Sequence, residues 1–196
     1  TQFGTNHLGH FELTRSLLPT LVAADGARII NLSSDGHRIG DIDFDDPNWE
    51  HRAYDKFVAY GASKTANVLH AVELDRRLRD TGVRAYAVHP GIVATSLARH
   101  MTGDDFRSLG KMASVERDPE ARRVDVTRDF TTPEQGAATQ VWAAVSDELA
   151  TGPSHGRRER RGPAVLIDQD GRDLAGLQNL ADLVDTYLDG VARDVA

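Results

Sequence analysis

Tyr60 and Lys64 are the residues in this sequence whose types and spacing most directly suggest chemistry. Four positions apart on a helix, their side chains lie on one face, with about 5–6 Å between the Cβ atoms. A tyrosine phenol has an ordinary pKa of about 10, so it transfers protons poorly at neutral pH unless a nearby positive charge favours the phenolate. The ammonium of Lys64 can supply that charge. The pair therefore suggests a proton-transfer site, although two unrelated surface residues can share this spacing by chance.

A second candidate residue, Ser34, follows a short apolar segment. Residues 28–34 (RIINLSS) have the pattern of a buried strand in a parallel sheet and are followed by the turn residues Asp35 and Gly36. In open α/β sheets, ligands bind beyond the carboxyl ends of the strands, and Ser34 lies at such an end. The sequence therefore favours a site that Ser34 shares with the tyrosine and lysine.

A strand-end serine followed by Tyr-x-x-x-Lys resembles the short-chain dehydrogenase/reductase family. The resemblance implies that Tyr60 is the general acid/base. It also implies that Lys64 binds the nicotinamide ribose and lowers the tyrosine pKa, and that Ser34 orients the substrate oxygen. The segment NHLGHF is similar to the family's helix that carries an active-site asparagine, which would make Asn6 the fourth catalytic residue.

Two further features resemble particular parts of the same family. Ser34 and Tyr60 are 26 positions apart, with His37 near the start of the gap, as in the retinol-dehydrogenase-like and protochlorophyllide-reductase-like branch. The segment HPGIVAT, which follows an apolar strand, matches the family's segment that holds the carboxamide end of the nicotinamide. The resemblance therefore assigns these residues to cofactor binding, together with Tyr60 and Lys64: Pro90, Gly91, Val93 and Thr95.

The elements that must position these residues can be predicted from apolar periodicity and from capping residues. We expect helices over residues 1–24, 57–78 and 174–191, a helix beginning at Pro133 with Thr132 as its N-cap, and strands over 28–34, 83–88 and 164–168. This order predicts an α/β fold, a Rossmann-like doubly wound parallel sheet of which the C-terminal half, about three strands with flanking helices, is present. Residues 35–55 are predicted to be a loop over the site, and about 99–132 a mobile, charged segment on the substrate side.

The glycine-rich turn that a nicotinamide enzyme needs after its first strand is absent from this sequence. The chain also begins without Met, in the middle of what the resemblance makes the fifth helix. We therefore expect residues 1–196 to be a partial short-chain dehydrogenase/reductase domain that carries the substrate and nicotinamide side. The residues that choose between NAD and NADP would lie in the missing half.

Composition excludes several classes of function. The 196 residues are 40% hydrophobic without an apolar run near 18, which predicts one soluble unit and no membrane span. Zero cysteines exclude disulfides and thiolate chemistry and fit a reducing cytoplasm. A net charge of −7 argues against a nucleic-acid partner, even at the arginine-rich segment 157–161. His7 and His10 have no evident third partner, so no metal site is expected.

The resemblance implies an oxidoreductase that interconverts an alcohol and a carbonyl by hydride transfer. Its cofactor would be NADP or NAD, its partner a small-molecule substrate, and helix 57–78 could form a homo-oligomer interface. One alternative stays open, in which the chain is a non-catalytic remnant or an interaction module that lacks cofactor binding. A serine hydrolase is a weaker alternative, because LSSDG supplies only the later glycine of a nucleophile elbow.

Overall fold

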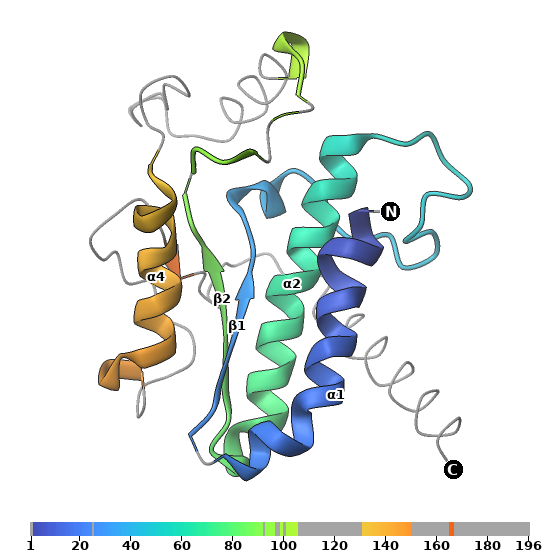
Figure 1. Ribbon diagram of the computed structural model, residues 1–196. Coiled ribbons are helices and arrows are strands. Elements are labelled where there is room, and N and C mark those ends of the chain that lie inside the picture. The colour runs from blue at the N-terminus through green and yellow to red at the C-terminus, as the bar shows by residue number, and fades with distance from the viewer. Residues whose placement is uncertain are drawn as a thin grey trace.

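The computed structural model describes residues 2–24, 26–91, 93–96, 99, 101–105, 131–149 and 165–166. Its elements follow in this order: the π-helical turn η1 (Gly4–Leu8), α1 (Gly9–Ala23), β1 (Arg28–Leu32), the 3-10 turn η2 (Asp35–Arg38), α2 (Lys56–Leu78), the 3-10 turn η3 (Arg79–Thr81), β2 (Arg84–His89), α4 (Pro133–Val145), the 3-10 turn η5 (Asp147–Leu149) and β3 (Val165–Leu166). Figure 1 shows three layers, with α1 and α2 over one face of a sheet and α4 over the other. The predicted α/β class is confirmed.

β1 and β2 form a parallel pair, from Arg28 opposite Arg84 to Leu32 opposite Val88. Helices cover both faces of this pair, which explains why both strands are nearly continuous apolar runs in the sequence. Side chains alternate between the two faces. Ile29 packs with residues of α1 and α2, whereas Val88 packs with residues of α4. The two strands therefore end side by side at one edge of the sheet.

β3 differs from the predicted parallel sheet. Its two residues pair with Val88 and His89 in the antiparallel sense, so the described sheet is mixed, with the order β1-β2-β3. An antiparallel edge strand on an otherwise parallel sheet is a common arrangement, because the edge is not constrained by a crossover helix on each side. The prediction of parallel strands with flanking helices is right for β1 and β2 and wrong for the direction of β3.

The described helices begin and end close to their predicted limits. α1 ends at Ala23, and Gly26 follows with a φ of 79°, in the left-handed region that glycine adopts without strain. α4 begins after Thr132, whose side chain accepts a hydrogen bond from the backbone N–H of Gln135 in a capping box. Among the described elements, no helix combines the length and apolar character needed to cross a membrane.

Several predicted segments lie wholly or mostly outside the described residues: the helix over 174–191, the arginine-rich segment 157–161 and most of the substrate segment 99–132. The beginning of the substrate segment is attached to α2. The ammonium of Lys56 pairs with the carboxylate of Asp105, and this contact is the main reason why the pKa of Asp105 falls to about 2. The ion pair joins Asp105 to the beginning of α2.

Asp75 joins α2 to the beginning of β2 and provides a test of the packing. Its carboxylate is buried and accepts hydrogen bonds from Arg84 Nε at 2.8 Å and from the backbone N–H of Ala85 at 3.2 Å. Asp75→Ala removes the carboxylate from a largely buried guanidinium. We therefore expect it to lower the free energy of unfolding by about 3 kcal/mol, measured by urea denaturation.

The control for this prediction is Glu12→Ala, which breaks a solvent-exposed ion pair with Arg15. Exposed pairs contribute little to stability, so the urea midpoint of Glu12→Ala should stay near that of the unaltered protein. Equal effects of the two substitutions would contradict the importance of the buried pair.

Candidate active site

One face of α2 carries four polar residues, Tyr60, Ser63, Lys64 and Asn67, at the spacing i, i+3, i+4 and i+7 that aligns side chains on a helix. Ser63 and Asn67 are 0% and 1% exposed. The sequence analysis identified the tyrosine and the lysine but missed the other two. Their helical spacing from Tyr60 is the signal that could have found them, because two small polar residues on this face of a buried helix need partners.

Lys64 connects α2 to the carboxyl end of β1. Its Nζ donates a hydrogen bond to the carbonyl oxygen of Leu32 at 3.1 Å and lies 5.5 Å from the centroid of the Tyr60 ring. Its own backbone carbonyl accepts a hydrogen bond from the Ser33 hydroxyl at 3.0 Å. Burial lowers the pKa of the Lys64 ammonium. The strand end and the lysine are therefore fixed to each other by two contacts.

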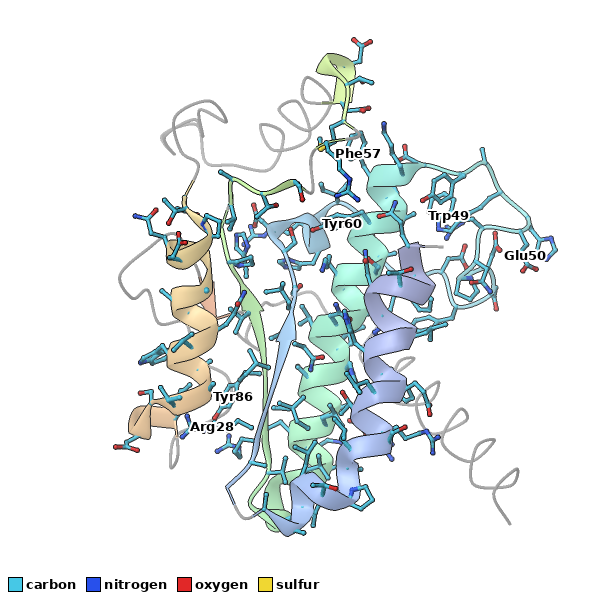
Figure 2. All side chains as sticks on the ribbon, in the orientation of Figure 1. Arg28, Trp49, Glu50, Phe57, Tyr60 and Tyr86 are labelled. Carbon is cyan, nitrogen blue, oxygen red and sulfur yellow. The ribbon has the colours of Figure 1, made fainter. Side chains whose placement is uncertain are left out.

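The side chain of Tyr60 extends from α2 toward the η2 turn (Figure 2). A Cβ atom at Gly36 would lie 2.8 Å from the ring carbon Cε1, so the turn packs directly on the ring. Ser34, at the N-cap of η2, accepts a hydrogen bond from the backbone N–H of Gly36 at 3.1 Å, and its Oγ would lie 3.3 Å from the same Cβ position. Ser34 and Tyr60 thus lie on either side of the η2 backbone at Gly36, and their catalytic roles stay a prediction.

The electrostatics of Tyr60 differ from what the resemblance implies. Burial raises the pKa of the phenol, and the nearby Ser34 hydroxyl lowers it only in part. The resemblance implied a tyrosine pKa lowered by Lys64, and the raised pKa contradicts this implication. Desolvation disfavours the phenolate more than the nearby serine hydroxyl favours it.

Asn6 reaches the site through Ser63. Its Nδ2 donates to the Ser63 hydroxyl at 3.1 Å, and that hydroxyl donates to the backbone carbonyl of Tyr60 at 2.7 Å. Asn6 lies in η1, a π-helical turn where the sequence predicted regular α-helix. Wider turns of this kind occur frequently at functional sites. The structure therefore joins Asn6, Ser34, Tyr60 and Lys64 in one set of neighbouring contacts.

The segment assigned to nicotinamide binding begins at the same edge of the sheet. Pro90 and Gly91 follow β2, and Gly91 has a φ of 80°. The neighbouring strand ends are joined because Ser33 N donates to Val88 O at 2.8 Å. Val93 packs against α4, where a Cβ atom at Gly136 would lie 2.5 Å from it. Together with exposed Thr95, these residues keep their cofactor role as a prediction.

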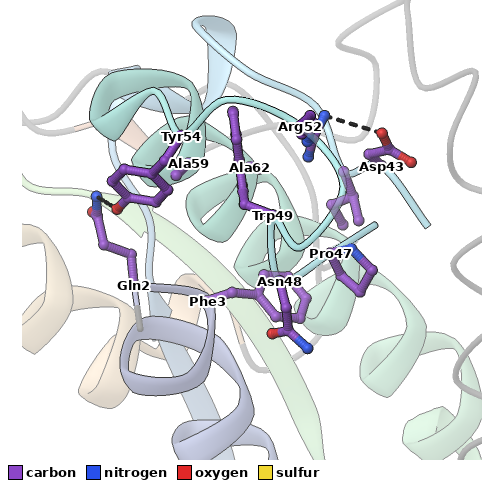
Figure 3. Close-up of a pocket in the computed structure, with 11 residues that line it drawn as sticks. Gln2, Phe3, Asp43, Pro47, Asn48, Trp49, Arg52, Tyr54, Ala59 and Ala62 are labelled. Carbon is purple, nitrogen blue, oxygen red and sulfur yellow. Dashed lines mark hydrogen bonds and ion pairs between the residues drawn. The ribbon is translucent and has the colours of Figure 1, made fainter. Parts of the chain in front are cut away.

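The loop after η2 does not cover the site as predicted. Figure 3 shows that Pro47, Trp49 and Arg52 line a pocket together with Phe3, just before η1, and Ala62 in α2. Arg52 holds the loop together, because its guanidinium lies 3.8 Å from the Trp49 ring centroid and 3.0 Å from the Asp43 carboxylate. The loop thus closes on itself, over a face of α2 that does not carry Tyr60.

The structure gives no support to hydrolase or metal chemistry in the residues it describes. His37 is the histidine nearest to Ser34 in sequence, and its Nδ1 faces the Ser34 backbone carbonyl at 2.7 Å instead of the hydroxyl. A serine nucleophile needs a base on its hydroxyl. No group of three or more histidines and carboxylates within the described ranges could hold a metal ion.

Comparisons with known proteins find similar sequences and a similar fold. Residues 47–105 match the family described as short chain dehydrogenase. Human retinol dehydrogenase 13 is 44% identical over 153 residues, which cover 76% of this chain and 42% of that protein. A probable oxidoreductase of Streptomyces lividans is 41% identical over 148 residues, which cover 76% of this chain and 48% of that protein.

A solved structure is similar in fold. The 3-oxoacyl-[acyl-carrier protein] reductase from Brucella melitensis has a TM-score of 0.50 and 22% identity, and the alignment covers 76% of this chain and 46% of that chain. The chain thus spans about half the length of the proteins it matches.

Gly61 provides a test of how tightly the site is packed. A Cβ atom at Gly61 would lie 2.6 Å from Gly40 N and 2.8 Å from Gly36 O, both of them backbone atoms. Gly61→Ala should therefore lower the free energy of unfolding by about 1–3 kcal/mol in urea denaturation. Gly4→Ala is the control, because nothing lies within 4 Å of its Cβ position and alanine is the better helix former. A stable Gly61→Ala would show that the turn is not held against α2.

Proposed function

Because the chain belongs to the short-chain dehydrogenase/reductase family, we propose that the whole protein is an NAD(P)-dependent oxidoreductase that interconverts an alcohol and a carbonyl. The observation that carries the proposal is the grouping of Ser34 and Tyr60 around Gly36 at the carboxyl end of β1, with the Lys64 ammonium 5.5 Å from the tyrosine ring. The strand end is the expected place for a ligand in an open α/β sheet. The relatives' names, retinol dehydrogenase and oxidoreductase, support the same class of reaction.

The nicotinamide of NAD or NADP would supply or accept the hydride at the substrate carbon. The residues at the sheet edge fit its ribose. Lys64 has a compact ammonium with three N–H donors, and the hydrogen bond to Leu32 uses one of them. The others can reach ribose hydroxyls, which a flat guanidinium would not contact in the same way.

Tyr60 would transfer the proton. In carbonyl reduction the phenol donates its proton to the substrate oxygen, and in alcohol oxidation the phenolate accepts it. Ser34 would hydrogen-bond the same oxygen and hold it beside the phenol. Asn6 would support proton exchange with solvent through water. The raised pKa of Tyr60 keeps the phenol neutral at physiological pH, which is the form that reduction requires.

Substitution of Tyr60 tests the proposal. Tyr60→Phe in the whole protein should lower turnover by about 10²–10⁴-fold, since a positioned acid or base contributes a factor of that size. Turnover is followed as NADPH or NADH consumption with a panel of aliphatic and aromatic aldehydes and ketones. Cofactor affinity, from titration of NADPH or NADH fluorescence, should stay the same because the ring and Lys64 remain.

The matched control is Tyr54→Phe, which removes the hydroxyl of an exposed tyrosine in the loop between η2 and α2. This variant should keep full turnover. Retained turnover in Tyr60→Phe would remove Tyr60 from its role. Failure of the whole protein to bind either dinucleotide would favour the alternative of a non-catalytic module.

The pH dependence of the two directions provides a separate test. Reduction needs the neutral phenol, whose pKa is raised above 10.0, so its rate should stay constant through neutral pH and decline only in strongly alkaline solution. Oxidation needs the phenolate, so its rate should increase with pH over the same range. A reduction rate that falls near neutral pH would contradict a raised tyrosine pKa in the working enzyme.

A further inference from the structure

Asn67 lies one helical turn after Lys64 and makes three hydrogen-bond contacts with other elements. Its Nδ2 donates to the carbonyl oxygens of Asn6 at 3.0 Å and of Leu32 at 3.1 Å, and its Oδ1 lies 3.1 Å from His7 Nδ1. An amide nitrogen carries two hydrogens and a carbonyl can only accept. The two carbonyls therefore determine which end of the amide is the nitrogen. The side chain is 1% exposed, so no solvent competes for these contacts.

His7 determines the orientation of this amide from the other side. The imidazole is 5% exposed and lies among aromatic rings, with its centroid 5.2 Å from Phe3, 6.1 Å from Phe11 and 5.7 Å from His70. Burial lowers the pKa of His7, so the ring is neutral. Because the Asn67 oxygen only accepts, the hydrogen of the neutral ring must be on Nδ1. The aromatic packing thus holds a donor against the amide.

The Leu32 carbonyl accepts from both the Asn67 amide and the Lys64 ammonium, each at 3.1 Å. Leu32 is the last residue of β1 and precedes Ser33, whose hydroxyl is bonded to α2. A shift of this carbonyl would move the acceptor on which the ammonium rests. Asn67 is therefore placed to control the lysine without contacting it.

We propose that Asn67, oriented by His7, is a positioning residue for the reaction proposed above, on which this inference rests. It holds the Leu32 carbonyl against the η1 turn and thereby sets where the Lys64 ammonium lies. Only an amide offers two donors and an acceptor in one plane at this size. A leucine of similar volume offers none, and an aspartate would direct a carboxylate at two carbonyl oxygens.

Variants of both partners test the proposal in the whole protein. Asn67→Leu removes the donors, and His7→Phe keeps an aromatic ring but removes the N–H. We expect each to lower kcat about tenfold or more while the KM for the carbonyl substrate stays within about twofold, the signature of a contact that matters in the transition state. His7→Asn places an N–H where Nδ1 was and should recover kcat to within about threefold of the unaltered protein.

Phe11→Leu is the control for packing. It loosens the same aromatic cluster without removing a hydrogen bond of the amide, so it should lower the melting temperature and leave kcat unchanged. Unaltered kcat in Asn67→Leu or His7→Phe would overturn the proposal. Losses of kcat that parallel the decrease in melting temperature in all variants would also overturn the proposal. The absence of kcat recovery in His7→Asn would do the same. If Asn67→Leu does not fold, the two His7 variants decide the question.

Two measurements separate this inference from the proposed function. Failure of the whole protein to bind either dinucleotide would overturn the proposed function, whereas retained turnover in Tyr60→Phe would remove only Tyr60 from its role. Hydrogen exchange of the Asn67 side-chain amide, followed by NMR, requires no turnover. Its protons should exchange slowly in the unaltered protein and faster in His7→Phe, because that ring offers no donor. Fast exchange in the unaltered protein would overturn the inference by itself.

Discussion

The hydrogen bonds that hold the carboxyl end of β1 against α2 determine where the candidate site can exist. The Leu32 carbonyl accepts from Lys64, the Ser33 hydroxyl donates back to the Lys64 carbonyl, and Ser33 N donates to Val88 O in β2. A backbone carbonyl at the end of a sheet strand moves little, because the ladder fixes it on one side. The rigid part of the fold thereby sets the position of a flexible lysine side chain. Helices and strands hold a functional group more precisely than loops do.

Close backbone approach provides the second constraint. The η2 turn, whose N-cap is Ser34, and the residues after it lie against the first turns of α2, where three glycines allow close approach: Gly36, Gly40 and Gly61. Thr65 fixes the contact by donating to the carbonyls of both His37 and Gly40 at 2.9 Å. The contact covers part of the Tyr60 side chain. This partial burial raises the pKa of the phenol, so tight packing and an acidic tyrosine are opposing requirements in this site.

Much of this arrangement was predictable from the sequence, and the remainder was not for identifiable reasons. Apolar periodicity, the capping box at Thr132 and the glycine at position 26 mark α1, α2, β1, β2 and α4 close to their observed limits. Tyr60 and Lys64 were recognisable from their helical spacing, and Ser34 because it follows an apolar strand. The π-helical turn at Asn6 was not, because its hydrogen-bond pattern depends on the tertiary contact with Asn67. The course of the loop past Trp49 was not predictable either, because it depends on the contacts of Arg52 with Trp49 and Asp43. These residues are close in sequence, but their spacing follows neither a helical nor a strand period.

The opposite pKa shifts of Tyr60 and Lys64 have one cause and one consequence for the proposed reaction. Burial raises the pKa of the phenol and lowers that of the ammonium, so it drives both groups toward their neutral forms. In carbonyl reduction, the phenol gives up its proton and becomes an anion close to an ammonium that is already in place. A charge that develops beside a fixed opposite charge in a poorly solvated site is stabilised more than it would be in water. Burial makes the phenolate of the free protein unfavourable. The same burial therefore increases the stabilisation of the transition state relative to the ground state, provided that the lysine is held where the negative charge forms.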